Sequence, residues 1–443
     1  MAPVETVADI DLLIEARWII PVQPAGLTLE RHAVAIHEGR ILAVQPIDDA
    51  RRQFRPREIR PLTDHILIPG LVNLHVHAAM TLMRGLADDL PLMRWLQEAI
   101  WPAEGRHVSP GFVRDGSLLA AAEMLRGGIT TCNDMYFFPE AAAEAFSRVG
   151  LRAMLGITVL EFPTQYAADA DDYLRKGLAA RDAWRHDPLI GFTLAPHAPY
   201  TVSDRTFERV GGLAEELDLP IHIHLHETAT EVADSLRDHG LRPIARLDRL
   251  GLLGPGLIGV HAVHLSPEDI DRLATHHCSI AHCPTSNMKL ASGAAPMAAV
   301  AERGLRIGLG SDGTASNNRL DLFREMHQAA LLAKLTTGDA GALPAHRVLR
   351  MATLDGAAAL GLDDRIGSIE PGKAADLCAV RLDDVDTLPC YDPASHLIYV
   401  LGRESVSDVW VAGRQALKDG TLLQISNTEL SSLARLWQNR LRQ

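Results

Sequence analysis

Between about residues 65 and 365, short apolar runs alternate with longer stretches that mix Ala and Leu with Glu and Arg. The apolar runs have the length of strands, and eight of them lie at 66–77, 129–136, 152–160, 189–200, 220–227, 257–264, 278–284 and 306–312. The stretches between them, such as 117–126, 204–217 and 267–275, have the composition of helices. Eight strand–helix repeats in about 300 residues predict an α/β fold, a (β/α)8 TIM barrel.

Both ends of the chain have a different pattern, in which short apolar runs follow one another without helical stretches. These runs lie at 12–14, 33–36, 41–44, 375–380 and 406–411. The sequence Glu38-Gly39-Arg40 between two of them is typical of a hairpin turn, and so is 412–414. The pattern predicts strands at both ends of the chain.

We therefore divide the chain into three segments. Residues 65–365 are expected to form the barrel, which is the catalytic domain in this interpretation. Residues 1–64 and 366–443 are expected to pair into one small β-sandwich domain built from both chain ends. A barrel of this size buries a large core, so the fold needs no disulfide.

Histidines or acids stand at the ends of six of the eight predicted strands. They are His75, His77, His197, His222, His224, His226, Glu227, His261, His264, His282 and Asp312. The carboxyl ends of barrel strands meet at one face, where barrel enzymes place their active sites. Any one of these histidines in isolation could be a hydrogen-bonded core residue. Their joint placement at one face predicts a functional site.

The chemistry that this set of side chains favours is metal-assisted hydrolysis. His75 and His77 share one face of a strand, which suits two ligands of one metal ion. Imidazole nitrogens and a carboxylate can leave one metal position open for water, and the ion lowers the pKa of that water toward about 7. A second acid must then move protons. Glu227 and Asp312 are the candidate acids, while alternation leaves the choice among the other strand-end histidines open.

Composition narrows the class of protein further. The formal net charge of −13 argues against nucleic acid and anionic membranes as partners, and no apolar run is long enough to span a bilayer. The five cysteines are scattered without CxxC spacing, which is typical of free thiols in a reducing compartment. The first residues show neither the basic nor the apolar region of a secretory signal. We therefore expect a cytoplasmic protein.

Several motifs in one order carry a resemblance to a known family. HVH at 75–77, HLHE at 224–227, VHAVHL at 260–265, GSDGTASNN at 310–318 and IGSIEPGKAADL at 366–377 resemble those of the amidohydrolase superfamily. Two further segments, 80–104 and 283–293 (CPTSNMKLASG), are similar to the 5′-methylthioadenosine/S-adenosylhomocysteine deaminase group and its chlorohydrolase relatives. The resemblance covers nearly the whole chain.

The resemblance implies a role for individual residues. One divalent metal ion, zinc before iron or manganese, is bound by His75, His77, His224 and Asp312. Asp312 also accepts a proton from water, Glu227 shuttles protons, and His261 polarises the group under attack. Strand 4 at 191–200 contains no lysine that could bridge two metals, which favours a single-metal site. Glu104 is implied to bind the ribose hydroxyls and His197 to position the substrate.

The implied reaction is hydrolytic deamination of an adenosine-type nucleoside to its inosine analogue and ammonia. No arginine stands near the end of strand 3 at 154–160, which favours 5′-methylthioadenosine over S-adenosylhomocysteine, with adenosine as a further substrate. The family also implies a homo-oligomer.

Three alternatives stay open. A guanine-type deaminase or a triazine amino- or chlorohydrolase would share the metal site but has no ribose to bind. In that case Glu104 is only a helix N-terminal acid after Pro102. A protein that binds metal or purine without catalysis is the third alternative. Trp95 and Trp101 either wall the substrate pocket or pack in the core.

Overall fold

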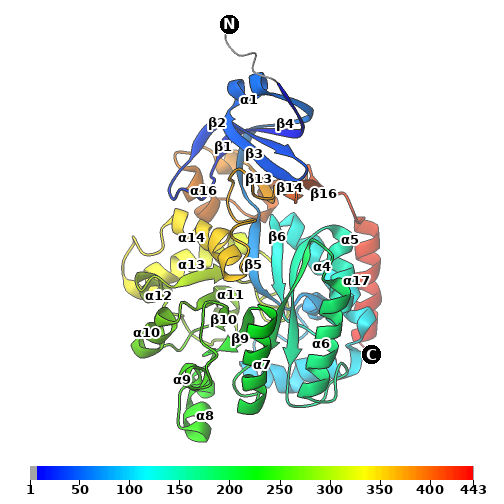
Figure 1. Cartoon of the computed structure of the whole chain (residues 1–443), viewed down its shortest axis with the longest axis vertical. Helices are drawn as coiled ribbons and strands as arrows, with labels where there is room; N and C mark the ends of the chain where they lie inside the picture. Colours follow the sequence, from blue (N-terminus) through cyan, green and yellow to red (C-terminus); the bar gives the residue numbers. More distant parts are fainter. Residues whose placement is uncertain (1–6, 443) are drawn as a thin grey trace.

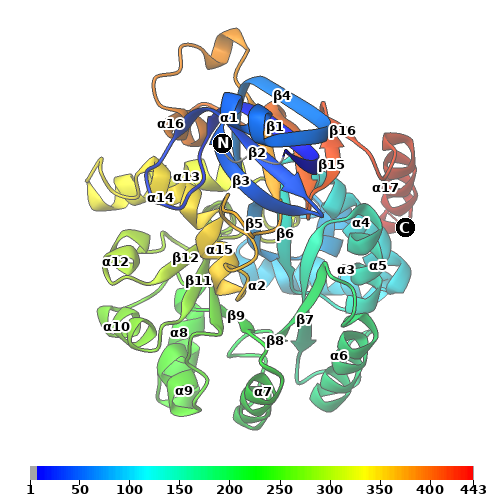
Figure 2. The ribbon, with the colours of Figure 1, turned by 45° about the horizontal axis from the view of Figure 1, so that its top comes forward.

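A computed structural model describes residues 7–442 and contains a parallel barrel that carries a second sheet at one end (Figure 1). The absence of a secretory signal is predicted from the first residues of the sequence. Residues 1–6 of that stretch lie outside the described residues. The helices of the barrel surround its strands, as Figure 2 shows from a second direction. The predicted (β/α)8 fold is confirmed.

Eight strands follow one another around the barrel in chain order, each hydrogen-bonded to its neighbour. They are β5 (Leu71–Val76), β6 (Ile129–Asp134), β7 (Arg152–Val159), β8 (Ile190–Pro196), β9 (Ile221–Leu225), β10 (Leu257–His261), β11 (Ser279–His282) and β12 (Arg306–Leu309). The paired strands run parallel, and nearly every residue in them is buried. Burial on both faces explains why these segments are apolar almost throughout instead of alternating.

Helices on the outside connect the strands. The principal ones are α4 (Pro110–Arg126), α5 (Pro139–Val149), α6 (Ala170–Trp184), α7 (Asp204–Leu217), α8 (Ala229–His239), α9 (Pro243–Arg249), α10 (Pro267–Thr275), α11 (Pro284–Lys289), α12 (Met297–Glu302), α13 (Leu322–Thr337), α14 (Ala345–Met351) and α15 (Leu354–Ala359). Several begin at a side chain that accepts a backbone N–H of the first turn, such as Ser203, Thr228 and Ser266. The three helices named from composition lie within α4, α7 and α10.

The second sheet contains strands from both ends of the chain. It consists of β1 (Ala8–Ile19), β2 (Leu29–His37), β3 (Arg40–Pro46), β4 (Phe54–Pro69), β13 (Leu377–Arg381), β14 (Val406–Val411), β15 (Arg414–Lys418) and β16 (Thr421–Leu422). β13 pairs with β4, which joins the two ends. Ile14, Val34, Leu67, Leu377 and Trp410 belong to an apolar core of this sheet's own. The helix α1 (Ile47–Gln53) contacts this sheet, whereas α16 (Pro393–Tyr399) contacts the barrel helices α13 and α14.

The C-terminal helix α17 (Asn427–Leu441) leaves this sheet and lies beside the barrel helix α4 (Figure 1). Its Trp437 is buried, and the indole N–H donates a hydrogen bond to the carboxylate of Asp115 over 2.9 Å. The sequence pattern predicted only strands in this end of the chain, and not this helix. Its apolar positions pack on a surface contributed by a segment more than 300 residues earlier, which a local pattern does not reveal.

One predicted strand is divided in the structure. The apolar run 66–77 was expected to form a single strand, but β4 ends at Pro69 in the second sheet and β5 begins at Leu71 in the barrel. Gly70 lies between the two strands. A larger residue does not fit there, because a Cβ atom would lie 2.1 Å from the Thr130 hydroxyl oxygen. The single-strand prediction was wrong at this point. The continuous apolar run reflects burial in two different sheets.

Hydrogen bonds between β5 and the residues after β12 close the barrel. The backbone N–H of Asp312 donates to the carbonyl of His75 over 3.0 Å. Beside it, the buried Asn73 side chain accepts the Ser311 N–H at 2.9 Å and donates to the Ser311 hydroxyl at 2.7 Å. The last strand end is therefore fixed next to the first.

The expectations about membrane spans and cysteines can be compared with the structure of residues 7–442. No helix in this range is both long and apolar enough to cross a membrane. The five cysteines are free thiols, and four of them are buried.

A buried ion pair joins the barrel to the second sheet. Arg152, the first residue of β7, donates through Nε and Nη2 to the two carboxylate oxygens of Asp376, each over 3.1 Å. The side chains are only 5% and 1% exposed, and the same carboxylate accepts the N–H of Ala412. Arg152 is the first residue of the strand predicted at 152–160, and this contact explains why a charge is buried there.

We predict that Asp376→Ala destabilises the protein far more than removal of an exposed acid in the same region. The substitution leaves the Arg152 guanidinium buried without its partner, which costs about 3–5 kcal/mol in free energy of unfolding. Asp383→Ala, which removes a half-exposed partner of Arg381, is the control and should cost about 0–1 kcal/mol. Urea unfolding measures both. Equal losses in the two variants would contradict the prediction.

Candidate metal centre and active site

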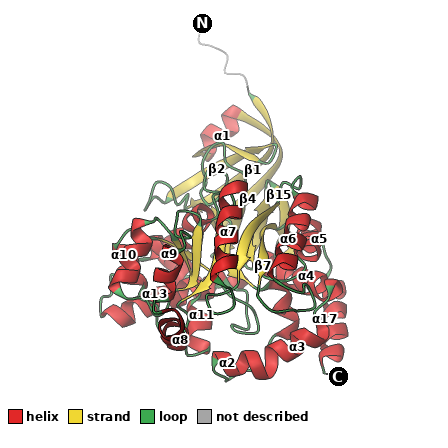
Figure 3. Cartoon of the chain, turned by 60° about the horizontal axis from the view of Figure 1, so that its bottom comes forward, coloured by secondary structure: helices red, strands yellow, loops and turns green. Residues whose placement is uncertain are grey.

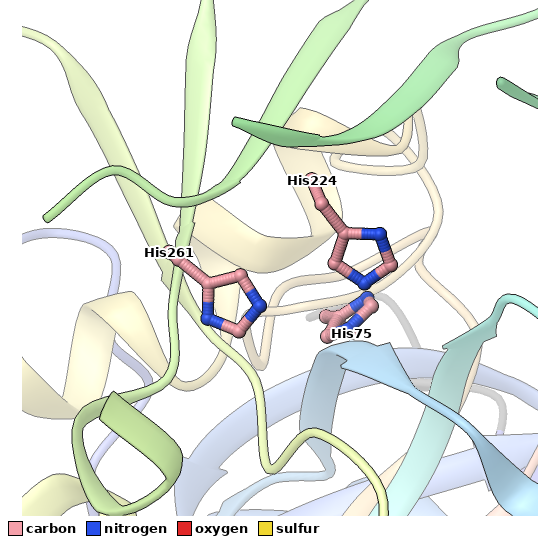
Figure 4. A group of neighbouring side chains, drawn as sticks. All are labelled: His75, His224 and His261. Atoms are coloured by element: carbon pink, nitrogen blue, oxygen red, sulfur yellow. The ribbon is translucent and has the colours of Figure 1, made fainter. Parts of the chain in front are cut away.

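Two barrel strands, β5 and β9, and the loop after β12 bring four predicted metal ligands together. The Nε2 atoms of His75 and His77 each lie 3.3 Å from Oδ1 of Asp312. The Nε2 atom of His224 lies 3.3 Å from that of His77. Figure 4 shows His75 and His224 turned toward one another, with His261 beside them. In that group of three, ligand atoms lie within 4.8 Å of one another, as they do in the group of His75, His77 and Asp312.

Backbone carbonyls orient two of these imidazoles. Nδ1 of His77 lies 2.6 Å from the carbonyl oxygen of Met135, and Nδ1 of His224 lies 2.8 Å from that of His197. A carbonyl oxygen only accepts, so each Nδ1 carries the hydrogen and each Nε2 is left with a lone pair. Both lone pairs point into the cluster, which is the tautomer that a metal ligand requires.

Burial keeps the imidazoles of the cluster neutral. Loss of water, reinforced by neighbouring imidazoles, lowers the pKa of His75 to about 3 and that of His224 well below its usual range. Burial acts to raise the pKa of Asp312, but the imidazoles of His75 and His77 outweigh it and hold that pKa well below its usual range. Nε2 of His75 is buried without a hydrogen bond among the described residues. Three imidazole nitrogens and one carboxylate fit a single divalent ion such as zinc.

Asp312 is held on both of its oxygens. Oδ2 accepts hydrogen bonds from the hydroxyls of Ser286 at 2.6 Å and Ser316 at 2.8 Å, and Oδ1 accepts the N–H of Gly313 at 2.7 Å. The backbone of Asp312 is in the left-handed region, with φ at +58°. The three hydrogen bonds to its carboxylate help to hold Asp312 in this conformation. They also keep the carboxylate directed at the histidines.

A second acid stands next to the cluster. Oε2 of Glu227 lies 3.7 Å from Nε2 of His261, and burial raises the pKa of Glu227 above its usual range. Nδ1 of His261 lies 2.9 Å from the amide oxygen of Asn287, so the ring donates there and turns Nε2 toward Glu227. The pair provides an acid that can hold or release a proton beside an oriented imidazole.

All of these acids and histidines except His75 line one cavity, which contains about 860 Å³ of empty space including its mouth. The opposite walls carry Trp101, Glu104, Tyr136, Phe137 and Phe162. Part of the wall comes from the segment α2 (Leu92–Trp95), η2 (Leu96–Ile100) and α3 (Trp101–His107). Figure 3 shows α2 and α3 on the side of the molecule opposite the second sheet. Trp95 and Trp101 both line the cavity, and Trp95 is buried as well, so it serves both of the roles that the sequence left open.

Glu104 and His197 both face this cavity. The Tyr136 hydroxyl donates to Oε1 of Glu104 over 2.7 Å, while burial outweighs this bond and raises the pKa of Glu104 to about 7. Glu104 also lies in the first turn of α3, as the alternative interpretation expects. Nδ1 of His197 lies 3.0 Å from the Thr201 hydroxyl oxygen, which leaves its Nε2 free toward the cavity.

The remaining strand-end histidines do not face the cavity. Nε2 of His222 lies 2.9 Å from Nδ1 of His75, behind the cluster. His226 donates to the carbonyl of His264 and accepts the N–H of Ile244, and His264 bonds to the carbonyl of Ser292. His282 is buried and contributes no lining. Of the histidines on or directly after β9 and β10, only His224 and His261 lie at the site.

Sequence reasoning did not single out several polar residues that orient the site. They are Tyr136, Ser286, Asn287 and Ser316, which bond to Glu104, Asp312, His261 and Asp312 respectively. Three of them belong to the motifs at 283–293 and 310–318 on which the family resemblance depends. That membership was the available signal, because residue type alone does not distinguish an orienting serine from a helix cap.

Comparison with known proteins agrees with this geometry. The model of the Amidohydrolase family matches residues 66–416. The 5-methylthioadenosine/S-adenosylhomocysteine deaminase of Teredinibacter turnerae is 46% identical over 98% of both chains. The protein of the same name from Saccharophagus degradans is 46% identical over 97% of this chain and 96% of its own.

A solved structure is also similar to this chain over nearly its whole length. The crystal structure of an adenosine deaminase from Xanthomonas campestris with bound zinc superposes with a TM-score of 0.97 at 49% identity, and covers 99% of this chain and 100% of its own. The family model spans most of the chain, and the relatives match it nearly end to end. The chain therefore belongs to the amidohydrolase family.

Proposed function

We propose that this protein is a metal-dependent hydrolytic deaminase that converts an adenosine-type nucleoside and water to the inosine analogue and ammonia. The single observation that carries the proposal is the placement of Glu227 and His261 beside the cluster of His75, His77, His224 and Asp312, on the wall of one cavity. The names of the similar proteins support the same reaction.

In this proposal His75, His77, His224 and Asp312 hold one divalent ion, with zinc preferred to iron or manganese. The zinc in the Xanthomonas campestris structure supports that preference. When bound, the ion supplies a Lewis acid that lowers the pKa of water toward about 7 and polarises the reacting carbon. The chain itself supplies neutral imidazoles and an ionised carboxylate, which are the forms that ligate.

Proton transfer is assigned to the two acids. Asp312 takes a proton from the attacking water, and Glu227 delivers a proton to N1 of the adenine ring so that the ring accepts the nucleophile at C6. Burial favours the protonated form of Glu227, which suits a donor. His261 donates through Nδ1 to Asn287 and turns Nε2 toward the reacting group, where the protonated ring donates to the oxygen that adds at C6. Asp312 then passes its proton to the amino group, so that the C6–N bond breaks and ammonia leaves. The new C6 hydroxyl gives its proton to Glu227, which leaves a carbonyl at C6 and restores both acids.

Glu104 is assigned to the ribose. As a carboxylate it accepts two hydroxyl hydrogens from a vicinal diol, and its Tyr136 bond fixes one oxygen. His197 positions the same part of the substrate, because its free ring nitrogen faces the cavity. A guanine or triazine substrate has no diol, so a half-buried carboxylate that faces the cavity at this place favours the nucleoside over these two alternatives.

The substituent at the 5′ position is proposed to be uncharged. Among the described residues that line the cavity there is no lysine or arginine, and Trp101, Phe137 and Phe162 contribute apolar surface. Arg152, the nearest candidate in the sequence, is bonded to Asp376 at the start of β7. A methylthio group is therefore favoured over the charged tail of S-adenosylhomocysteine.

The proposal includes the setting in which the protein acts. Free thiols support the cytoplasm, where cysteines stay reduced. A homo-oligomer is supported by large exposed apolar side chains such as Val385 and Tyr391, which are 80% and 90% exposed.

The first prediction concerns the substrate. We expect zinc-loaded protein to release ammonia from 5′-methylthioadenosine, with lower kcat/KM for S-adenosylhomocysteine and adenosine and no turnover of guanine. The physical reason is the diol acceptor combined with the absence of a cation in the lining. Ammonia release and the loss of adenine absorbance measure it. Turnover of guanine or a triazine in place of the nucleosides would contradict the proposal.

The second prediction concerns Glu227. Glu227→Gln removes the proton donor but keeps the shape, so kcat should fall by about 10²–10⁴-fold. The metal content should stay unchanged, because Glu227 is not among the proposed ligands. Steady-state kinetics and elemental analysis measure the two quantities. Glu140→Gln, a half-buried acid in the first turn of α5, is the control and should keep full activity. Full turnover by Glu227→Gln would refute the assigned role.

The third prediction is a pH dependence of substrate affinity. The pKa of Glu104 is raised to about 7, so this carboxyl group takes up a proton as the pH falls from 8 to 6 and loses strength as an acceptor. The KM for the nucleoside should therefore rise as the pH falls through about 7. Glu104→Gln should raise KM about 10–100-fold at pH 8 and abolish its dependence on pH.

The control for the third prediction is Glu98→Gln, which alters an exposed acid paired with Arg94. It should retain both the affinity and the pH profile of the unchanged protein. An identical pH dependence of KM in Glu104→Gln would show that another group titrates.

A further inference from the structure

We propose that Glu231 is a positioning residue for the reaction, which holds the backbone at His226 and Glu227 so that the Glu227 carboxyl group stays aimed into the cavity. The inference rests on the proposed role of Glu227 as proton shuttle. Glu231 lies in the first turn of α8, four residues beyond Glu227, and does not line the cavity that holds the metal cluster.

The Glu231 carboxylate binds two consecutive backbone N–H groups. Oε1 accepts the N–H of His226 and Oε2 accepts the N–H of Glu227, each over 2.8 Å. The Glu231 residue is only 6% exposed. Two adjacent N–H groups that point the same way form a concave site for an anion, and here the anion is supplied by the chain. Both oxygens of one buried carboxylate are therefore used to fix two residues of the loop.

This arrangement departs from an ordinary helix start. The sequence Thr228-Ala229-Thr230-Glu231 has the pattern of a capping box, in which the acid would bond back to the N–H of Thr228. One half of the box is present, because the Thr228 hydroxyl accepts the N–H of Glu231 at 3.1 Å. The carboxylate instead reaches past Thr228 to the two preceding residues. A side chain suited to capping the helix is thus directed at the backbone of the shuttle acid.

The backbone that Glu231 holds is in an unfavourable conformation. His226 has a φ of +54°, in the left-handed region that a side chain with a Cβ atom rarely adopts. Its carbonyl accepts the N–H groups of Val263 and His264, which tie it to the end of β10. Such a conformation persists where its surroundings over-determine it. Glu231 supplies the two bonds on the N–H side of this turn.

The consequence for Glu227 follows from its own contacts. Among the described residues, no donor hydrogen-bonds its carboxyl oxygens, and Nε2 of His261 lies 3.7 Å from Oε2. Its direction is therefore set through its backbone. If residues 226–227 relax toward an ordinary φ, the carboxyl group swings away from the cavity. Loss of Glu231 should lower the rate of proton transfer more than it changes substrate affinity.

The test compares Glu231→Gln with a matched control. Glutamine keeps the size but offers one acceptor oxygen, so one N–H faces an amide NH₂ group. We expect kcat for 5′-methylthioadenosine to fall about 10–100-fold while KM changes less than about threefold and the metal content is unchanged. Glu15→Gln alters a glutamate of equal exposure, 6%, which lies in β1 of the second sheet and pairs with Arg51 of α1. It should keep the kcat of the unchanged protein even if its melting temperature falls.

A second readout does not depend on activity. Hydrogen–deuterium exchange of the peptide spanning 223–231 should accelerate in Glu231→Gln and not in Glu15→Gln, because the two N–H groups lose a buried acceptor. Glu231→Asp keeps two oxygens on a shorter side chain and should recover part of the kcat. If Glu231→Gln does not fold, Glu231→Asp decides, with an intermediate kcat and faster exchange expected.

The outcomes separate this inference from the proposed function. A protein that turns over no nucleoside at all contradicts the proposed function, and the exchange experiment still decides whether Glu231 holds the backbone. An active protein whose Glu231→Gln variant keeps its kcat overturns the positioning role. Unaccelerated exchange at 223–231 overturns it as well.

Discussion

Closure of the barrel between its first and last strands is the constraint on which the rest of the site depends. The N–H of Asp312 donates to the carbonyl of His75, and Asn73 bonds twice to Ser311 beside it. These bonds fix the spacing between the Asp312 carboxylate and the imidazoles of β5. Without them, an acid and two histidines separated by more than 230 residues would not share one point in space. A metal ion bound there would further stabilise the folded state, since its ligands are assembled only in that state.

The site combines groups that are individually unfavourable. Burial removes water from several imidazoles and so keeps them neutral, while a single carboxylate among them stays ionised. The backbone is left-handed at His226, His261 and Asp312, near the ends of three strands. Each such conformation costs about 1–3 kcal/mol and is retained only because neighbouring hydrogen bonds leave no alternative. The large barrel core provides the stability that offsets these costs.

Several elements show where sequence patterns succeed and where they fail. The strand–helix alternation predicted the barrel, because buried parallel strands are apolar throughout and leave a clear signal. The run 66–77 was assigned to one strand, since burial in two successive sheets has the same pattern as burial in one. His222, His224 and His226 are equivalent by alternation. Only the family resemblance selected His224, and in the structure the other two bond to His75 and His264.

The sequence by itself determined the fold class, the participation of both chain ends in the second sheet, and the residue types from which the site is built. The fold class and the second sheet follow from local periodicity. The site follows from histidines and acids placed at the ends of strands, where they have few structural roles. Tertiary structure alone decided which nitrogen of each histidine faces the cluster, which residues orient Asp312 and Glu227, and that Arg152 serves Asp376. It also decided that Glu231 bonds beyond its own helix. The physical reason is that hydrogen-bond partners and burial depend on segments far apart in the chain, and their geometry leaves no local pattern.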